Sequence, residues 1–299
     1  GHVRGGLGYV AIIAACILSA LSGSAAADAA ALGALLVPMM VRAGHDKARS
    51  VGLVASASII GPIIPPSITM ILYGIASETS IGRLFLAGVI PGLLLTGLFM
   101  AWALFLSWKR GTKLVDADRI YSLKEKLELL PKLLPFIVVI IGVIYALYGG
   151  IATPSEAAGV GAMLCLVMVI AIYRVWTPTA LWHIMRDGLR ESGMLMLIIG
   201  ASILFGYMMS SLLVTQSVAE AIAEMQVNKW VVLGAINAML LVAGMFLPPA
   251  AIILMTTPIL MPVILAFGFD PIWFGVILTI NMELGLITPP VGLNLFVIN

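Results

Sequence analysis

Two Pro-Pro pairs inside apolar runs constrain this chain more than any other feature. Pro65 and Pro66 lie in the middle of the apolar residues 51–76, and Pro289 and Pro290 lie in a second apolar run near the last residue. Two adjacent prolines cannot continue an α-helix, because each lacks an N–H and its ring clashes with a carbonyl one turn back. The sequence therefore predicts two broken helices.

Composition places both breaks in a membrane. Of the 299 residues, 62% are hydrophobic and 10% are charged, and the mean hydropathy is +1.14, whereas soluble proteins carry roughly 25% charged residues. In hydrocarbon, open backbone survives only where protein buries it or where it lines a cavity, so each break is a candidate binding site. The net charge of +2 gives no reason to expect a nucleic-acid partner. Cys16 and Cys165 lie in apolar stretches and are interpreted as small hydrophobic residues, not as a disulfide or a metal pair.

The two breaks belong to an internal repeat whose copies lie 224 residues apart without a gap. Glycine and proline dominate the identities, and these residues set backbone shape. Pro38, Gly44, Asp46, Gly61, Ile63, Pro65 and Pro66 match Pro262, Gly268, Asp270, Gly285, Ile287, Pro289 and Pro290.

Short apolar limbs precede each break. Residues 7–21 and 29–41 flank a polar tip at residues 22–28, and residues 230–246 and 250–265 flank a second tip at residues 247–249. Each limb is shorter than the ~20 residues of a perpendicular crossing. We therefore expect two re-entrant hairpins. Between the copies we expect crossings near residues 84–107, 133–148, 155–173 and 192–214, with amphipathic cytoplasmic arms at 108–132 and 174–191.

The two copies are expected to face opposite sides of the membrane. The loop at residues 42–49 holds three Lys or Arg residues and should be cytoplasmic, whereas the aligned loop at 266–273 holds none. Five crossings, counting the first broken helix, separate the copies, and an odd number requires inversion. By the same symmetry we expect a longer native chain, with roughly 100 further upstream residues and one more crossing downstream. We expect a transport domain from residues 1–77 and 229–299 and a scaffold from 78–228.

Two acidic residues lie at membrane depth. Asp28 sits beside Ser22, Gly23 and Ser24 at the first tip, and a carboxylate there costs about 2.5–3.5 kcal/mol. An ion or substrate role is the main hypothesis for Asp28, and capping of the second limb is the alternative. Glu283 precedes the second break and either couples protons or only pairs with a neighbouring helix.

Hydroxyls and amides cluster around both breaks and serve either binding or interhelical hydrogen bonding. They are Ser67, Thr69, Asn281, Thr288 and Asn294. Free carbonyls before a break suit Na⁺, and free N–H groups after it suit a carboxylate.

Several stretches together resemble one family, the large membrane subunit of tripartite ATP-independent periplasmic (TRAP) transporters. They are residues 21–28 (Leu-Ser-Gly-Ser-Ala-Ala-Ala-Asp), 43–47, 63–67, 84–88 and 285–292. The resemblance implies a bacterial inner-membrane, Na⁺-driven importer of carboxylates with an elevator mechanism, of the sialic acid or sugar acid type or the C4-dicarboxylate type. It also implies a periplasmic substrate-binding protein and a small four-helix membrane subunit. Glu283 departs from the small or neutral residue that the family pattern implies at this position.

The sequence thus predicts an all-α polytopic membrane protein, an inverted-repeat elevator-type transporter with two re-entrant hairpins and two discontinuous helices. The alternatives are a proton-coupled transporter, a channel and a membrane-embedded enzyme with an Asp28–Glu283 aspartyl dyad. The first predicted Na⁺ site comprises Ser22, Gly23, Ser24, Asp28, Gly61 and Pro65, and the second comprises Gly285 and Thr288 with the second tip. The predicted substrate site comprises Ser67, Thr69, Thr288 and Asn294.

Overall fold

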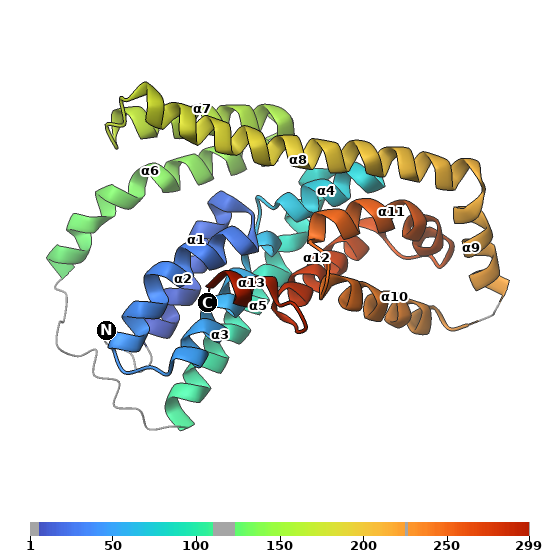
Figure 1. Ribbon diagram of the computed structural model, residues 1–299, viewed down its shortest axis with the longest axis horizontal. Coiled ribbons are helices and arrows are strands. Elements are labelled where there is room, and N and C mark those ends of the chain that lie inside the picture. The colour runs from blue at the N-terminus through green and yellow to red at the C-terminus, as the bar shows by residue number, and fades with distance from the viewer. Residues whose placement is uncertain (1–5, 110–122, 225–226, 299) are drawn as a thin grey trace. The chain divides into compact units, whose positions relative to one another are not determined.

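The computed structural model describes residues 6–109, 123–224 and 227–298, and these residues form helices and no strand (Figure 1). The all-α prediction is therefore confirmed. Five helices in the described ranges are long and apolar enough to cross a membrane, and a bent pair raises the number to six. They are α2 (Ala25–Arg42), α5 (Ile81–Lys109), α7 (Pro154–Ala171), α8 (Pro178–Ser211) and α11 (Pro249–Ala266). The chain is a multi-pass membrane protein.

The first copy of the repeat begins with a helical hairpin. Helix α1 (Gly6–Ser22) turns into α2 at Gly23, whose φ of +61° is a left-handed conformation that glycine adopts without steric cost. Ser24 then caps α2, because its hydroxyl accepts the Ala27 N–H. A helical hairpin is present where the first re-entrant hairpin is predicted, although Asp28 lies in the first turn of α2 and not in the tip itself. The capping alternative for Asp28 is wrong, since Ser24 holds the cap.

The first broken helix follows directly. Helix α3 (Lys47–Ser58) gives way to a 3₁₀ turn, η1 (Gly61–Ile63), and then to α4 (Ile68–Ser77), with a bend of 42°. The break lies where the Pro-Pro pair predicts it.

The second copy repeats these boundaries. Helix α10 (Lys229–Gly244) and α11 form the second hairpin, and α12 (Pro271–Ile287) and α13 (Leu293–Ile298) flank the second break. The first residues of α2 and α11, their last residues, and the first residues of α3 and α12 are each 224 positions apart. Asp46 and Asp270 cap α3 and α12 in the same way, and Gly44 and Gly268 both have positive φ. The repeat in sequence is thus a repeat in local structure.

Each copy also packs on the other. Helix α4, which follows the first break, packs against α11 of the second hairpin, and α13, which follows the second break, packs against α2 of the first hairpin. Likewise α12 contacts α4 and α3 contacts α13. The half-helix after each break therefore covers the second limb of the other copy's hairpin.

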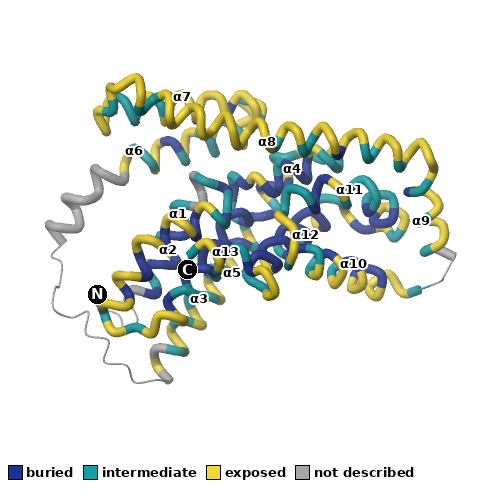
Figure 2. The backbone as a smooth tube through the Cα atoms, viewed as in Figure 1, coloured by how far each residue is buried: buried dark blue, intermediate teal, exposed yellow. Residues whose placement is uncertain are grey.

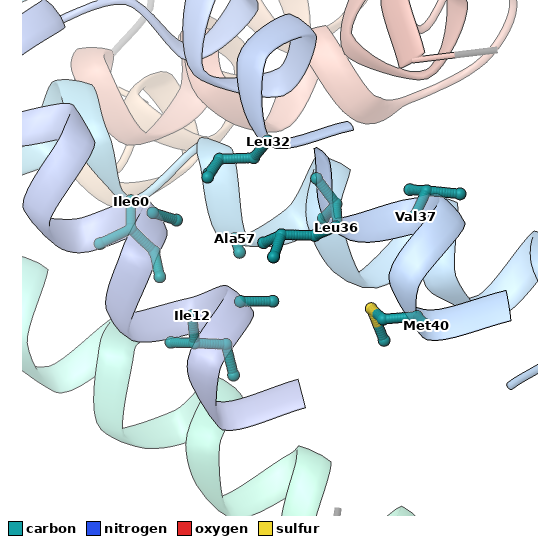
Figure 3. Packing of buried hydrophobic residues seen from close by; sticks show 10 residues of the cluster. Ile12, Leu32, Leu36, Val37, Met40, Ala57 and Ile60 are labelled. Atoms are coloured by element: carbon teal, nitrogen blue, oxygen red, sulfur yellow. The ribbon is translucent and has the colours of Figure 1, made fainter. Parts of the chain in front are cut away.

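These packed elements form one compact unit, Gly1–Ile120 with Phe205–Asn299. Its buried residues lie mainly in α1 to α4 and α10 to α12 (Figure 2). Leu32, Leu36, Val37 and Met40 of α2 face Ile12 of α1 and Ala57 and Ile60 of the first broken helix (Figure 3). Both predicted transport-domain segments fall in this unit, together with α5 and α9 (Val214–Glu224).

The second compact unit is Tyr121–Leu204. In it α6 (Leu123–Tyr148) packs against α7, which begins with a capping box between Thr153 and Glu156. The predicted arm at residues 174–191 and the predicted crossing at 192–214 lie largely on one continuous helix, because α8 runs unbroken from Pro178 to Ser211 and contains no proline after its first residue. Of the other predicted arm, residues 110–122 lie outside the described residues, and the rest from Leu123 is continuous with the following crossing.

Candidate functional site

The first hairpin tip lies directly against the first break. A Cβ atom on Gly23 would lie 3.1 Å from the Pro66 carbonyl oxygen and 3.2 Å from the Ile68 nitrogen. Beside it, the Ser22 hydroxyl donates to Asp28 Oδ1 at 2.6 Å, and the Ser24 N–H donates to Ser22 Oγ at 3.2 Å. Asp28 is fully buried. The predicted residues of the first tip and the first break are therefore neighbours, as the sequence predicts.

Protein also closes the first break from the other side. Gly88 of α5 approaches so closely that a Cβ atom there would lie 2.7 Å from the Ile63 carbonyl oxygen, and Gly92 packs against Ile64 in the same way. Gly61, Pro65 and Ser67 are buried. The break is covered on both sides, as open backbone in a membrane requires.

The second tip and the second break approach each other in the same manner. A Cβ atom on Gly285 would lie 2.7 Å from backbone atoms of Gly244, where α10 ends. Thr288 follows α12, and its hydroxyl donates to the Leu284 carbonyl oxygen at 2.6 Å. The described hydrogen bonds of Thr288 and of Ser67, which caps α4 by accepting the Met70 N–H, stay within their own helices.

The two breaks meet through a first polar pair. The Thr69 hydroxyl, at the second residue of α4, donates to Glu283 Oε1 at 3.4 Å. Glu283 is 1% exposed, and its Oε2 atom has no hydrogen-bond donor among the described residues. Asp28 lies within electrostatic range of Glu283. Polar side chains from both copies, Thr69 and Asp28 from the first and Glu283 from the second, thus lie in one buried region.

A second polar pair joins the copies, and here the residue that follows the second break contacts the helix that precedes the first break. The Asn294 amide nitrogen, on α13, donates to Ser58 Oγ at 3.1 Å, and Ser58 donates in turn to the Ala55 carbonyl oxygen at 2.8 Å. Asn294 is fully buried, and its Oδ1 atom has no donor among the described residues. A buried amide oxygen without a donor carries a desolvation penalty of about 1–3 kcal/mol.

Comparison of the two copies shows that the fold does not require polar residues at these contacts. Asn294 and Ser58 correspond to Met70 and Met282, and Thr69 and Glu283 correspond to Leu293 and Ile59. Met70 and Met282 are fully buried. Each copy therefore has a polar contact where the symmetric contact consists of apolar residues, and the polar set supplies chemistry that packing alone does not need.

Two site residues are absent from the sequence-based list. Ser58 belongs to no sequence motif, and only its match to a buried position in the other copy could have identified it as a site residue. Asn237 is an amide in the apolar limb of α10, and its side-chain oxygen accepts from the Asn281 amide, while its own amide donates to the Leu233 carbonyl oxygen. An amide within an apolar limb is a signal that the sequence offered.

The described residues contain no group of three or more His, Cys, Asp or Glu side chains that would hold a metal ion. The donors at the tips and breaks are carboxylate, hydroxyl, amide and backbone carbonyl oxygens, which are the ligands of hard cations. Oxygen ligands of this kind are chemically suited to a hard cation, whereas the N-terminal end of a half-helix suits an anion.

Comparison with known proteins agrees with this architecture. The family model of the tripartite ATP-independent periplasmic transporter, DctM component, matches residues 1–299. The C4-dicarboxylate TRAP transporter large permease protein of Pseudomonas aeruginosa is 40% identical over 99% of this chain and 69% of its own length. The sialic acid large permease of Vibrio cholerae is 36% identical over 100% of this chain and 69% of its own length. The 2,3-diketo-L-gulonate large permease of Escherichia coli is 37% identical over 100% of this chain and 70% of its own length.

These matches define the class as a transporter permease and not an enzyme. The chain belongs to the family of large permease components of tripartite ATP-independent periplasmic transporters. The resemblance inferred from the two breaks and the first hairpin tip is confirmed, and the aspartyl-enzyme alternative is wrong.

Proposed function

We propose that this chain imports a small organic acid against its gradient, driven by Na⁺, through an elevator-like movement of the two hairpins and two broken helices. One observation carries the proposal. Two broken helices each meet a hairpin tip, and both breaks are joined by buried polar pairs, Thr69–Glu283 and Asn294–Ser58. A site closed by two separate tips suits alternating access better than a continuously open channel.

The substrate class follows from the relatives and the helix ends. The relatives named above carry C4-dicarboxylate, sialic acid and 2,3-diketo-L-gulonate in their names. We assign a small carboxylate, a sugar acid or a C4-dicarboxylate, to the region around Ser67, Thr69, Thr288 and Asn294. The N-terminal end of α4 presents N–H groups and a positive dipole end there, and both favour a carboxylate.

The coupling ion is assigned to the oxygen-rich contacts of tips and breaks. One Na⁺ site comprises Ser22, Gly23, Ser24 and Asp28 with the break around Gly61 and Pro65, where tip and break are in contact. The other comprises Gly285 and Thr288 with the second tip, where Gly285 contacts Gly244. Hard cations prefer such oxygen ligands.

The proposal includes two protein partners and a location. A periplasmic substrate-binding protein delivers the substrate, and a small four-helix membrane subunit completes the complex in the bacterial inner membrane. The family is described as a tripartite periplasmic transporter, which supports this assembly.

Uptake by reconstituted complexes tests the proposal. The permease, reconstituted with its small subunit in proteoliposomes and supplied with binding protein and radiolabelled carboxylate, should accumulate substrate only under an inward Na⁺ gradient. Flux that equilibrates without accumulation, whatever the ion gradient, would show a channel. Equal uptake without binding protein at micromolar substrate would remove that partner from the mechanism.

Proton coupling through Glu283 is the second candidate, because this buried carboxylate has an oxygen without a donor among the described residues. Under Na⁺ coupling, Glu283→Gln should keep uptake dependent on the Na⁺ gradient. Uptake driven by a proton gradient alone, and abolished in Glu283→Gln, would favour the second candidate.

A further inference from the structure

The first copy of the repeat contains a cavity of 460 Å³ between α1, the α2–α3 loop, α3 and α5. Its walls include Gly8 of α1, Gly52 of α3 and Phe99 and Trp102 of α5. His45 and Arg49 line it at the end where α3 begins. It is separate from the tips and breaks described above.

The second copy has larger side chains at the positions that match the α1, loop and α3 walls of the cavity. Gly8 and Gly52 correspond to Val232 and Val276, and His45 and Arg49 correspond to Phe269 and Trp273. The rings of Phe269 and Trp273 stack with centroids 5.6 Å apart, and Trp230 packs edge-on against both. At these positions the first copy therefore has glycines and basic residues where the second copy has valines and stacked aromatic rings, so the open room beside α1 and α3 depends on the first copy's side chains.

Gly8 and Gly52 leave open space, and neither position needs glycine to avoid a steric clash. A Cβ atom on Gly52 would meet no atom within 4 Å, and one on Gly8 would meet only the Leu53 side chain at an ordinary 3.5 Å. Neither glycine has a positive φ. Open space that close packing would normally fill indicates a ligand that the fold accommodates.

The residues that line the cavity suit an amphipathic anion as its ligand. Ile12, Met40 and Ala57, which belong to the buried cluster in Figure 3, form an apolar wall. At the other end, the Arg49 guanidinium makes no ion pair with any described residue. Asp46 also lines the cavity, but its Oδ1 accepts the Arg49 backbone N–H as the cap of α3. The ligand therefore combines an anionic group with an apolar body.

Exposed aromatic residues and a basic segment beside the cavity indicate that it lies at a membrane surface. Helix α5 exposes Trp102, Phe105 and Trp108 near its end, and Trp102 stacks on Phe105 with centroids 5.7 Å apart. Exposed aromatic residues of this kind lie at the headgroup level of a bilayer. The basic loop at residues 42–49 is expected on the cytoplasmic side, where anionic lipids attract Lys and Arg.

We propose that this cavity binds an anionic phospholipid of the cytoplasmic leaflet, with its phosphate at Arg49 and His45 and an acyl chain along Ile12, Met40 and Phe99. The contact ties α5 to the first hairpin and the first broken helix through a lipid. The occupant is independent of which carboxylate or coupling ion the protein uses.

Lipid retention tests the proposal. The purified permease is equilibrated in nanodiscs of phosphatidylcholine with phosphatidylglycerol, extracted, and examined by native mass spectrometry and thermal unfolding. Wild type should retain phosphatidylglycerol over phosphatidylcholine. Arg49→Gln should retain it about fivefold less, from the loss of one basic contact. Gly52→Val, which introduces the second copy's residue into open space, should lose it with unchanged folding.

Two matched variants serve as controls. Lys47→Gln removes a cation of the same loop that does not line the cavity, and Gly234→Val adds the same side chain to a helix position that is open but distant from the cavity. Both should retain phosphatidylglycerol as wild type does. Equal retention by Gly52→Val and wild type, or no preference for phosphatidylglycerol, would overturn the proposal. Displacement of the lipid by millimolar inorganic phosphate would reassign the cavity to a soluble anion.

Discussion

Glu283 and Asn294 each keep one buried oxygen atom that has no donor among the described residues, at the two contacts where the breaks cross. Most buried side-chain polar atoms have partners, so such exceptions are commonly linked to a function or to an ion. The symmetric contacts are made by Met70, Met282, Leu293 and Ile59, which carry no such cost. The polar residues at these contacts therefore lend themselves to variants that separate stability from transport.

The Thr69 hydroxyl is the described donor to Glu283. Thr69→Val keeps the shape of the side chain but removes the described donor to Glu283 Oε1, which should cost about 1–3 kcal/mol of stability. Thr69→Ser keeps the hydroxyl and is the control. Thermal unfolding of both variants in detergent, with Na⁺-driven uptake in proteoliposomes, measures the difference. A Thr69→Val protein as stable as Thr69→Ser would show that the hydrogen bond contributes nothing.

Asn294→Met should have the opposite effect on stability. Methionine is the residue at the symmetric position, and it removes the buried amide oxygen without a donor. Ser58 is not left unsatisfied, since its hydroxyl donates to the Ala55 carbonyl oxygen. We expect unfolding at the same or a higher temperature and at least a tenfold loss of uptake, equivalent to about 1.4 kcal/mol of binding. Normal uptake by this variant would exclude Asn294 from the substrate site.

At the scale of the elements, the contact between the first tip and the first break can be tested through glycines. Gly23→Ala must adopt a positive φ and also place its Cβ 3.1 Å from the Pro66 carbonyl oxygen. Gly44→Ala has the same φ problem at +88° but meets no atom within 4 Å. Both should lose about 1 kcal/mol of stability from the left-handed conformation. Only Gly23→Ala should also require a higher Na⁺ concentration for the half-maximal rate of uptake. Equal Na⁺ dependence in the two variants would separate the tip from the ion site.

Helix breaks, caps and hairpins were predictable because proline, glycine and capping residues act locally. The Pro-Pro pairs located both breaks, and Asp46 and Asp270 fell on helix caps in both copies. The unbroken length of α8 and the helix α9 were not predictable in this way. In α8 a basic amphipathic stretch continues into an apolar one without any residue that stops a helix, so the change in composition near residue 192 does not coincide with a helix end.

The pairing of Asn294 with Ser58 was equally unpredictable from the sequence, because the two residues are 236 positions apart and their contact depends on how the two copies pack together. Thr69 and Glu283 were recognised as candidates, but sequence could not show that they contact each other. Local chemistry identifies residues, whereas three-dimensional packing decides their partners.

At the scale of the whole molecule, the opposite orientation of the two copies remains a prediction with a direct test. Arg42 and Ala266 are the last residues of α2 and α11, and both are exposed. In a background carrying Cys16→Ala and Cys165→Ala, Arg42→Cys should react with a membrane-impermeant maleimide only from the cytoplasmic side. Ala266→Cys should react only from the periplasmic side. Labelling of both positions from one side in spheroplasts would contradict inversion.

The interlock of the two copies also sets the order in which the chain can mature on the ribosome. Helix α2 packs against α13, and a Cβ atom on Gly33 would lie 2.9 Å from the Ile298 side chain. The first hairpin therefore leaves the translocon long before its cover is synthesised, and it must wait in a partly folded state. Since helices insert first and pack later in a bilayer, the nascent first copy should be a substrate for membrane quality control until α13 arrives.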